Sequence, residues 1–172
     1  MGGDVLGVQA HKKEPLCVNV MVVTISDTRT KETDKSGQKM LELLKQQHQV
    51  IAYDIVKDNE QVIKRTMLQG CTDPRVQVIL MNGGTGIAKR DVTFDVLQAH
   101  IERPIPGFGE LFRMLSYEEI GSAAMLSRAS AGVIQDTVIF SVPGSTNAVS
   151  LAMEKLILPE LAHIVREMNK AT

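Results

Sequence analysis

The sequence predicts an α/β fold, a three-layer α/β/α sandwich whose central sheet is mostly parallel and includes one short antiparallel hairpin. Three observations favour this class. Short apolar runs rich in β-branched residues alternate along the chain with segments of helical periodicity. The runs at 17–25 and 76–81 are almost continuously apolar, as in parallel strands that are buried on both faces. Polar or glycine-rich loops follow the strands, where open α/β sheets place their ligand sites.

The first half of the chain supplies three strands and two helices. Strands are recognised by β-branched content, helices by apolar residues three and four positions apart, and breaks by glycine, proline and short polar residues. Residues 1–15 are predicted to be a flexible tail before a single domain at 16–170. The predicted elements in order are a strand at 17–25, a loop at 26–35, a helix at 37–47 capped by Ser36, a strand at 50–56, a helix capped by Asp58 or Asn59 and ending at Gly70, and a strand at 76–81.

The second half supplies four helices and a hairpin. The short apolar segments 133–134 and 138–140 lie around Gln135-Asp136, and such a two-residue turn predicts the antiparallel hairpin. In the helix at 108–120, Leu111 and Leu115 are expected to face the core. A further short helix is expected at 123–131. The helices are predicted at 92–100, at 108–120, at 123–131, and at 146–169 with an interruption at Pro159.

Composition excludes several classes of function. The net charge is −1 and aromatic residues make up only 3% of the chain, so neither a basic field nor a base-stacking surface for nucleic acid is expected. No apolar run is long enough to span a membrane, and the first residues do not resemble a signal peptide. Cys17 and Cys71 are expected to be reduced, buried thiols of a cytoplasmic protein.

The stretch 77–95 is the strongest candidate for function. A strand runs into Asn82-Gly83-Gly84-Thr85-Gly86, and a helix begins near residue 92. Bare N–H groups of such a turn can form a concave anion site, because glycine lets the backbone approach a ligand closely. Arg90 adds a cation, and Asp91 adds a carboxylate suited to a hard metal ion. The alternative is a tight turn followed by a helix cap.

Two further loops at the ends of strands are expected to converge with the glycine loop. The loop after the first strand supplies Ser26, Asp27 and Ser36, while the loop at 142–147 supplies Gly144 and Ser145. Several carboxylates and two anion sites suit a nucleotide together with a second phosphorylated ligand. Asp27 can equally be a turn residue. Glu110 and Arg113 can form an ion pair within one helix or belong to the site.

Common nucleotide and nucleophile motifs are absent. No GxxxxGK[ST], no GxGxxG after the first strand and no GxSxG elbow occur. The segments NGGTGIAKRDVT, GFGELFR, AMLSRA and SVPGSTNAV, with SDT and DKSG before them, instead resemble the molybdenum cofactor biosynthesis protein B family. That family is close to the molybdopterin adenylyltransferases, and the resemblance extends from about residue 17 to residue 167.

The resemblance implies a molybdopterin pocket and, in the adenylyltransferase branch, ATP, Mg²⁺ and the release of pyrophosphate. It implies that the chain adenylylates the terminal phosphate of molybdopterin, or alternatively that it binds molybdopterin without catalysis. It also implies trimers or hexamers, and contacts with other molybdenum cofactor enzymes are possible. Asp91 and Asp27 are the expected catalytic and metal-binding residues. The expected ligand-binding residues are Ser26, Ser36, Gly37, Gly83, Gly84, Thr85, Gly86, Arg90, Pro143, Gly144 and Ser145.

The chain departs from the adenylyltransferase pattern at two places. Met81-Asn82 stands where those enzymes more usually have threonines, and Phe94-Asp95 stands where they favour Pro-Glu. The second change shortens a carboxylate on the expected metal side. Apolar residues on more than one face of the helix at 108–120 also predict that Phe112, Met114 or both lie at or near a subunit boundary.

Overall fold

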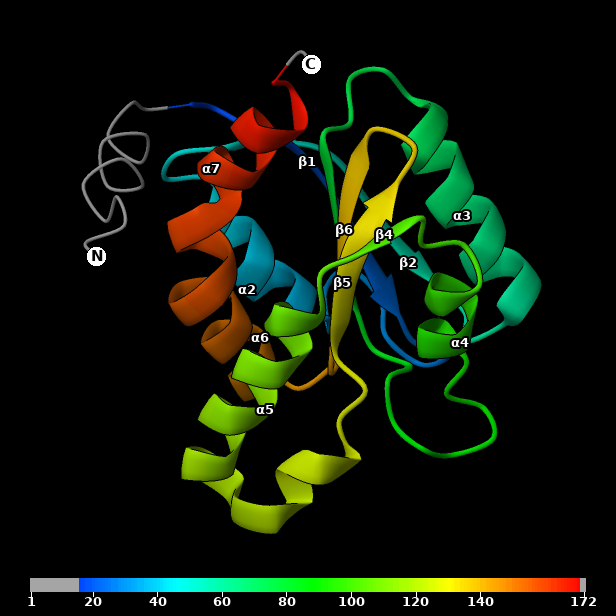
Figure 1. Ribbon diagram of the computed structural model, residues 1–172. Coiled ribbons are helices and arrows are strands. Elements are labelled where there is room, and N and C mark those ends of the chain that lie inside the picture. Colours follow the sequence, from blue (N-terminus) through cyan, green and yellow to red (C-terminus); the bar gives the residue numbers. More distant parts are fainter. Residues whose placement is uncertain (1–15, 171–172) are drawn as a thin grey trace, which may run out of the picture.

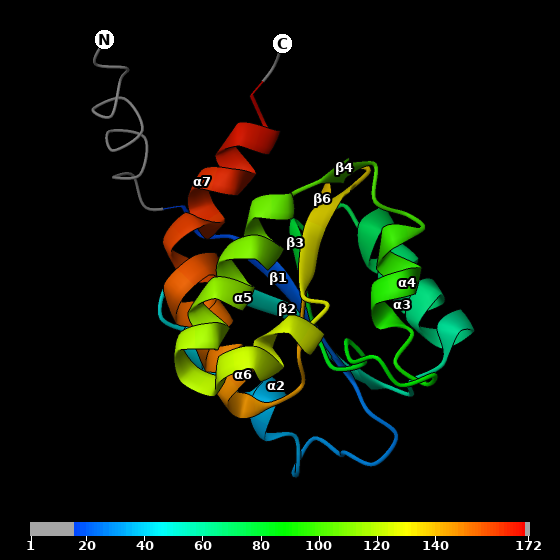
Figure 2. The ribbon, with the colours of Figure 1, turned by 60° about the horizontal axis from the view of Figure 1, so that its bottom comes forward.

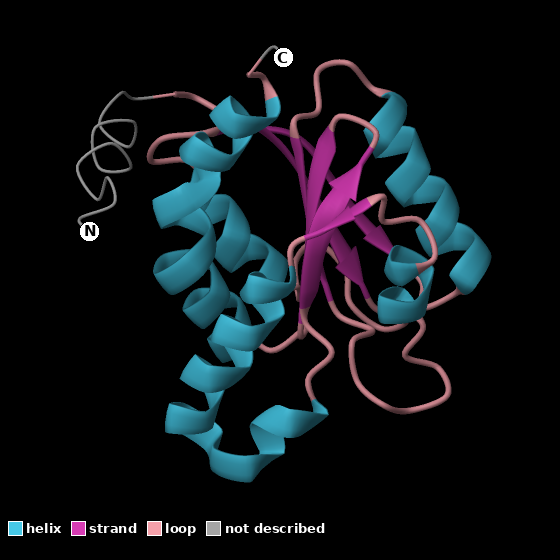
Figure 3. Ribbon diagram, viewed as in Figure 1, coloured by secondary structure: helices cyan, strands magenta, loops and turns pink. Residues whose placement is uncertain are grey.

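The centre of the molecule is a six-stranded sheet in the order β2-β1-β3-β6-β5-β4. The computed structural model describes residues 16–170, so the predicted tail lies outside the described residues. Helices cover both faces of the sheet (Figures 1 and 3), which confirms the three-layer architecture. The strands are β1 (Asn19–Ile25), β2 (Gln49–Val56), β3 (Val78–Asn82), β4 (Arg103–Pro104), β5 (Ser130–Ile134) and β6 (Thr137–Val142).

Four strands are parallel and the hairpin is antiparallel, as predicted. β2, β1, β3 and β6 run in one direction, and β5 folds back on β6 through a two-residue turn between Ile134 and Thr137. β4 is an additional edge strand that the sequence did not predict, because the two prolines nearby read as an irregular connection. Proline is tolerated there because an edge strand leaves N–H positions without a partner.

The helices divide into two layers. On one face lie α2 (Lys35–Leu44), α5 (Pro106–Ile120), α6 (Thr146–Ala152) and α7 (Leu158–Met168); on the other lie α3 (Glu60–Thr72) and α4 (Thr93–Gln98) (Figure 1). Successive residues of the central strands therefore enter different cores. Val20 and Val22 pack with the α2 side, whereas Met21 and Val23 pack with the α3 side. This two-sided burial explains why the strand sequences are almost continuously apolar.

The segment after α5 differs from the prediction of a short helix at 123–131. A 3₁₀ helix, η1 (Gly121–Leu126), comes first, and β5 begins at Ser130. Ala131 lies in β5 opposite Phe140 and is buried. Alanine favours helices in isolation, but pairing with β6 buries this segment in the sheet and overrides that local preference.

The inward face of α5 also differs from the prediction. Phe108 and Phe112 are buried, and the Phe108 ring packs edge-on against Phe140 with 5.0 Å between ring centroids. Leu111, expected inside, is exposed, while Leu115 is partly buried against the core. Phe112 is only 1% exposed and Met114 is 55% exposed, and the expectation that Phe112, Met114 or both lie at or near a subunit boundary stays a prediction. The two phenylalanines, four residues apart, define the core face of this helix.

The structure also tests the predicted helix caps, the burial of the two cysteines and the interruption of the last helix. Asp34, rather than Ser36, caps α2 by accepting a hydrogen bond from the Gly37 N–H, and Asn59 caps α3. Cys17 is exposed, which contradicts the prediction of a buried thiol, whereas Cys71 is buried. The last helix is interrupted as predicted, because a π-helical turn, η2 (Met153–Ile157), precedes α7. None of the helices within 16–170 is both long and apolar enough to cross a membrane.

Candidate functional site

The loops after β1, β3 and β6 meet at one edge of the sheet (Figure 2). These three strands are neighbours in the order β1-β3-β6. The chain leaves β1 for β2 on one side and returns to β3 on the other, so the edge between β1 and β3 is a topological switch point. Crevices outside such points are where open α/β sheets bind ligands. The predicted convergence of the three loops is therefore present.

The glycine loop has the backbone conformation that its sequence requires. Gly83 and Gly84 have φ angles of +102° and +64°, which residues with a Cβ rarely adopt. Among the described residues, the N–H groups of Gly84, Thr85 and Gly86 have no hydrogen-bond acceptor. A Cβ on Gly86 would lie 2.7 Å from Asp91 Oδ2, so this glycine leaves room for the carboxylate. The loop thus offers free donors beside a carboxylate.

Two cavities lie on either side of this loop and share Gly84 and Asp91 in their walls. The larger, about 380 Å³, has an apolar wall from α5 and η1 that includes Phe112, Ile120 and Leu126. Its opposite wall is polar and comes from the glycine loop and the turn after β6: Gly83, Thr85, Gly86, Pro143, Gly144 and Ser145. The smaller, about 260 Å³, is lined by the loop after β1, the loop after β2 and the residues before α4.

Three carboxylates surround the smaller cavity: Asp27, Asp58 and Asp91. The Asp58 N–H donates to Asp27 Oδ1 at 3.1 Å, and the Ala88 N–H donates to Asp91 Oδ2 at 3.0 Å. Asp58 Oδ1 is buried and has no hydrogen-bond partner. Burial raises the pKa of Asp58, and the nearby charges of Asp91 and Asp27 raise it further. A bound cation would relieve this concentration of negative charge.

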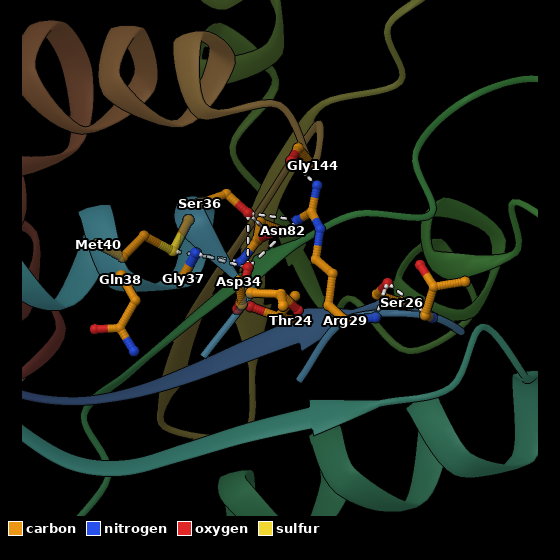
Figure 4. A network of polar contacts seen from close by, with 12 residues as sticks. Thr24, Ser26, Arg29, Asp34, Ser36, Gly37, Gln38, Met40, Asn82 and Gly144 are labelled. Atoms are coloured by element: carbon orange, nitrogen blue, oxygen red, sulfur yellow. Dashed lines mark hydrogen bonds and ion pairs between the residues drawn. The ribbon is translucent and has the colours of Figure 1, made fainter. Parts of the chain in front are cut away.

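Residues Ser36 and Gly37 belong to a buried polar network beneath the site (Figure 4). Asp34, at its centre, accepts hydrogen bonds from the Ser36 hydroxyl at 3.0 Å, the Gly37 N–H at 3.0 Å and the Tyr53 hydroxyl at 2.6 Å. Burial alone would raise the pKa of Asp34, but these hydrogen bonds outweigh it and lower the pKa. A Cβ on Gly37 would lie 2.1 Å from Asp34 Oδ2, so close packing explains this glycine.

The same network joins two of the converging loops. Arg29 donates to Ser36 Oγ at 2.6 Å and to the carbonyl of Gly144 at 2.9 Å, and its guanidinium lies 3.4 Å from Asp34 (Figure 4). Asn82 Oδ1 lies 2.9 Å from Ser36 Oγ as a second acceptor for its single proton, which connects the network to the end of β3. Arg29 thereby fixes the turn after β6 relative to the loop after β1.

The structure brings most of the predicted site residues together. Ser26, Asp27 and Arg90 line the smaller cavity, Gly84 and Asp91 line both, and the remaining loop residues named above line the larger one. Ser36 and Gly37 line neither cavity, so direct contact between them and a ligand stays a prediction. Glu110 and Arg113 line a separate cavity of about 180 Å³, away from the glycine loop.

Sequence reasoning missed Asp58, Arg29 and Arg128. Asp58 was considered only as a helix cap, although it follows β2 at the same sheet edge, and this position was the available signal. Arg128 contacts the glycine loop from a segment 42 residues away from Gly86, a pairing that no local pattern indicates. Of the departures from the adenylyltransferase pattern, Asn82 is buried and Asp95 pairs with Arg128 at 3.0 Å, so neither side chain lines a cavity.

Replacing Gly84 with alanine is expected to lower the free energy of unfolding by about 2 kcal/mol, because of its positive φ and a clash. The new Cβ would lie 2.2 Å from Thr93 Oγ1 and 3.2 Å from Asp58 Oδ1. Urea unfolding measures this loss. Gly107→Ala is the matched control, since a Cβ there meets nothing within 4 Å and should be neutral or slightly stabilising. Equal stability of Gly84→Ala and wild type would contradict the geometry.

Comparison with known proteins is consistent with this arrangement. A family model described as a probable molybdopterin binding domain matches residues 21–163. The molybdenum cofactor biosynthesis protein B of Bacillus subtilis is 56% identical over 168 residues, which cover 96% of this chain and 99% of that protein. A crystal structure titled molybdenum cofactor biosynthesis protein B has 56% identity and a TM-score of 0.90, covering 92% of this chain and 100% of that one.

A more distant structure extends the comparison. The tungsten cofactor synthesizing protein MoaB from Pyrococcus furiosus has 34% identity and a TM-score of 0.80, covering 91% of this chain and 100% of that chain. The match to the family model spans most of the sequence and includes the glycine loop, the carboxylates and the turn after β6. Fold, loops and near full-length identity agree: the chain belongs to the molybdenum cofactor biosynthesis protein B family.

Proposed function

We propose that this chain, which belongs to a family of molybdenum cofactor biosynthesis, binds molybdopterin and adenylylates its terminal phosphate with Mg-ATP. The observation that carries the proposal is the pair of adjacent cavities with Gly84 and Asp91 in their common wall. A transfer reaction between two phosphorylated molecules requires two neighbouring sites with the reacting groups at the boundary. Both cavities open beside free backbone N–H donors of the glycine loop.

The larger cavity suits the pterin. Its apolar wall of Phe112, Ile120 and Leu126 can pack against a flat ring system. The free N–H groups of Thr85 and Gly86 and the Ser145 side chain can then hold the terminal phosphate on the opposite wall. In this orientation the phosphate lies toward the boundary with the smaller cavity.

The smaller cavity suits the polyphosphate of ATP with a magnesium ion. Three carboxylates alone would repel a polyphosphate, so a cation must accompany the nucleotide. Carboxylate oxygens, with the unpartnered Oδ1 of Asp58 among them, fit a hard cation. The residues from 16 to 170 contain no cluster of three or more acidic, histidine or cysteine side chains arranged as a metal cage. In the proposal, a magnesium ion would therefore bind through one or two of these carboxylates and would complete its coordination with waters and substrate phosphates.

In the proposed reaction, a terminal phosphate oxygen of molybdopterin attacks the α-phosphorus of ATP. The bond from that phosphorus to the bridging oxygen breaks, and pyrophosphate leaves. Asp91 and Asp27, with Asp58 beside them, would hold Mg²⁺, which when bound neutralises charge on the leaving pyrophosphate. Arg90 supplies a cation beside the polyphosphate. Positioning and neutralisation of charge carry most of the catalysis in this class of reaction.

Incubating the full chain with molybdopterin, ATP and Mg²⁺ tests the proposal, with adenylylated product and pyrophosphate as the readouts. Product formation that requires all three components supports it. Binding of molybdopterin without any product would instead establish the rival function, a molybdopterin-binding protein that transfers no AMP. The two departures from the adenylyltransferase pattern do not decide between them, because neither Asn82 nor Asp95 lines a cavity.

We further propose that the chain self-associates through α5 and η1 as a trimer or as a hexamer of paired trimers. An apolar surface on these two elements is 47–74% exposed and consists of Leu111, Met114, Tyr117, Ile120, Met125 and Leu126. Exposed apolar side chains concentrated on two neighbouring elements usually mark an interface, and closed symmetric assemblies are the usual means of covering them.

Light scattering is expected to give a mass that is a multiple of three chains. Met114→Lys should reduce this mass, because it places a charge in the apolar surface defined above. Met114→Leu, which retains an apolar side chain of similar size, should leave the assembly intact. A monomer at micromolar concentration for the wild type would contradict this proposal, while a dimer would contradict the threefold symmetry.

A further inference from the structure

Arg128 holds together the loop that carries Asp91. Its own N–H donates to the carbonyl of Thr85 at 3.2 Å, and its side-chain Nε donates to the carbonyl of Gly86 at 2.9 Å. Its Nη2 donates to the carbonyl of Asp91 at 2.5 Å, and its Nη1 donates to both carboxylate oxygens of Asp95 at 3.0 and 3.1 Å. One side chain therefore contacts the loop at its beginning, at its end and at the first turn of α4.

These contacts depend on the shape of the guanidinium group. Arginine presents several donors in a flat, fixed arrangement, whereas lysine presents a single ammonium group that cannot reach several acceptors at once. The guanidinium carbon also lies 4.9 Å from the centre of the Phe94 ring, which supports the group from one face. Phe94 and Asp95, which form one of the two departures from the adenylyltransferase pattern, are thus both partners of Arg128.

The loop has few other attachments. Residues 87–90 are exposed, and the internal bonds of the loop run between Ala88 and Asp91: the Asp91 N–H donates to the Ala88 carbonyl at 2.9 Å, and Ala88 returns a bond to the Asp91 carboxylate. These bonds shape the turn but do not attach it to any residue outside the loop, so they open more often when the loop is loose. The Thr93 N–H, which donates to the Gly84 carbonyl at 3.1 Å, fixes the loop only at its base. The Val92 N–H also bonds the Asp58 side chain. Arg128 holds the Asp91 carbonyl itself and connects this end of the loop to the segment that leads into β5.

We infer that Arg128 is the positioning residue for Asp91: by binding the Gly86 and Asp91 carbonyls, it keeps the Asp91 carboxylate in the wall shared by the two cavities. Its importance for catalysis rests on the proposed function, but the position of the loop does not. Arg128 lines neither cavity, so it acts through Asp91 and does not contact the ligands. Its neighbour Ser127 lines the larger cavity, so Arg128 also connects that wall to the loop.

Hydrogen exchange of the full chain, resolved to single amides, tests the inference without any ligand. Arg128→Ala and Arg128→Lys are both expected to accelerate exchange at Ala88 and Asp91 by about tenfold or more, the effect of losing a charge-assisted hydrogen bond. Amides of β1 should be unchanged. Arg103→Ala is the matched control, because Arg103 donates to the Gln135 carbonyl at the far edge of the sheet. The affinity of Mg-ATP, measured by calorimetry, should fall in the two Arg128 variants and not in the control.

Comparing Arg128→Lys with Arg128→Ala distinguishes a role in positioning the loop from a role as a positive charge. If Arg128 acted only as a positive charge near the phosphates, Arg128→Lys would keep both the loop protection and the affinity of the wild type, and the inference would be overturned. Unchanged loop exchange in either folded Arg128 variant would overturn it as well, and Arg128→Lys decides the question should Arg128→Ala not fold. Faster loop exchange together with no Mg-ATP binding by the wild type would refute the proposed function and still support the role of Arg128.

Discussion

Asp91→Asn is expected to lower the rate of adenylyl transfer by about a hundredfold or more, because it removes a charge that holds Mg²⁺ beside the developing charge of the reaction. Asp91 lines both cavities, and its Oδ2 already accepts a bond from the Ala88 N–H. Asparagine keeps the size of the side chain and can still accept that bond through its own oxygen. The fold of the loop and the binding of molybdopterin should therefore persist.

Single-turnover assays and molybdopterin titrations of the same preparation measure the two effects separately. Asp136→Asn is the matched control, since Asp136 is an exposed aspartate in the β5–β6 turn, at the opposite end of β6 from the cavities. Near-normal turnover by Asp91→Asn would remove Asp91 from the mechanism. A wild type that binds molybdopterin and forms no product would favour the rival binding function instead.

Asp34→Ala is expected to lower the free energy of unfolding by about 3–5 kcal/mol, because it removes one partner from a buried, charged network. Asp34 is fully buried and is a hydrogen-bond acceptor for Ser36 and Gly37 (Figure 4). It also accepts a hydrogen bond from the Tyr53 hydroxyl. Its removal leaves the Tyr53 hydroxyl donor without its acceptor, takes away the carboxylate beside the Arg29 guanidinium and removes the cap of α2. Because Arg29 also holds the Gly144 carbonyl, the turn after β6 should loosen as well.

Urea unfolding at neutral pH measures this loss, and the exposed pair of Asp73 and Arg75 provides the control. These two side chains lie 2.6 Å apart, and Asp73 also accepts a bond from the Arg75 N–H, so Asp73→Ala should cost far less stability than Asp34→Ala. A loss no larger for Asp34→Ala than for Asp73→Ala would show that the network contributes nothing beyond a surface ion pair.

The pH dependence of stability should differ between wild type and Asp34→Ala. The fold lowers the pKa of Asp34 from its ordinary value of 3.8. As the pH falls, Asp34 therefore becomes protonated in the unfolded chain before it does in the folded chain. The ionised Asp34 stabilises the fold fully above the unfolded pKa, and this stabilisation is lost as the pH falls through the folded pKa. Acid unfolding of the wild type should consequently be steeper in this range than that of Asp34→Ala.

The elements themselves follow from short-range patterns in the sequence. The alternating burial of Val20 and Met21 in two different cores requires an apolar residue at every position, and this is visible in the sequence before any fold is known. Likewise, the positive φ angles of Gly83 and Gly84 are available to glycine at little cost, so the loop could be recognised from its composition. The convergence of the loops follows from a general property of parallel sheets.

The errors occur where distant segments compete with local preference. Residues 123–131 read as helix, yet pairing with β6 draws Ala131 into the sheet. Ser36 reads as a helix cap, yet Asp34 takes the cap and the Ser36 hydroxyl lies beside Asn82, 46 residues away. In both cases the deciding partner lies too far along the chain for any local pattern to include it.

The division between local and tertiary information is clearest at the site. Residue types alone indicate strands ending in a glycine loop, a carboxylate at Asp91 and a polar turn at 143–145, because backbone conformation and charge are properties of single residues and their neighbours. Only the tertiary structure places Asp58 beside Asp27, Arg29 against Gly144 and Arg128 across the loop that carries Asp91. Those contacts form because the sheet order brings three strand ends to one edge, and strand order depends on packing over the whole chain.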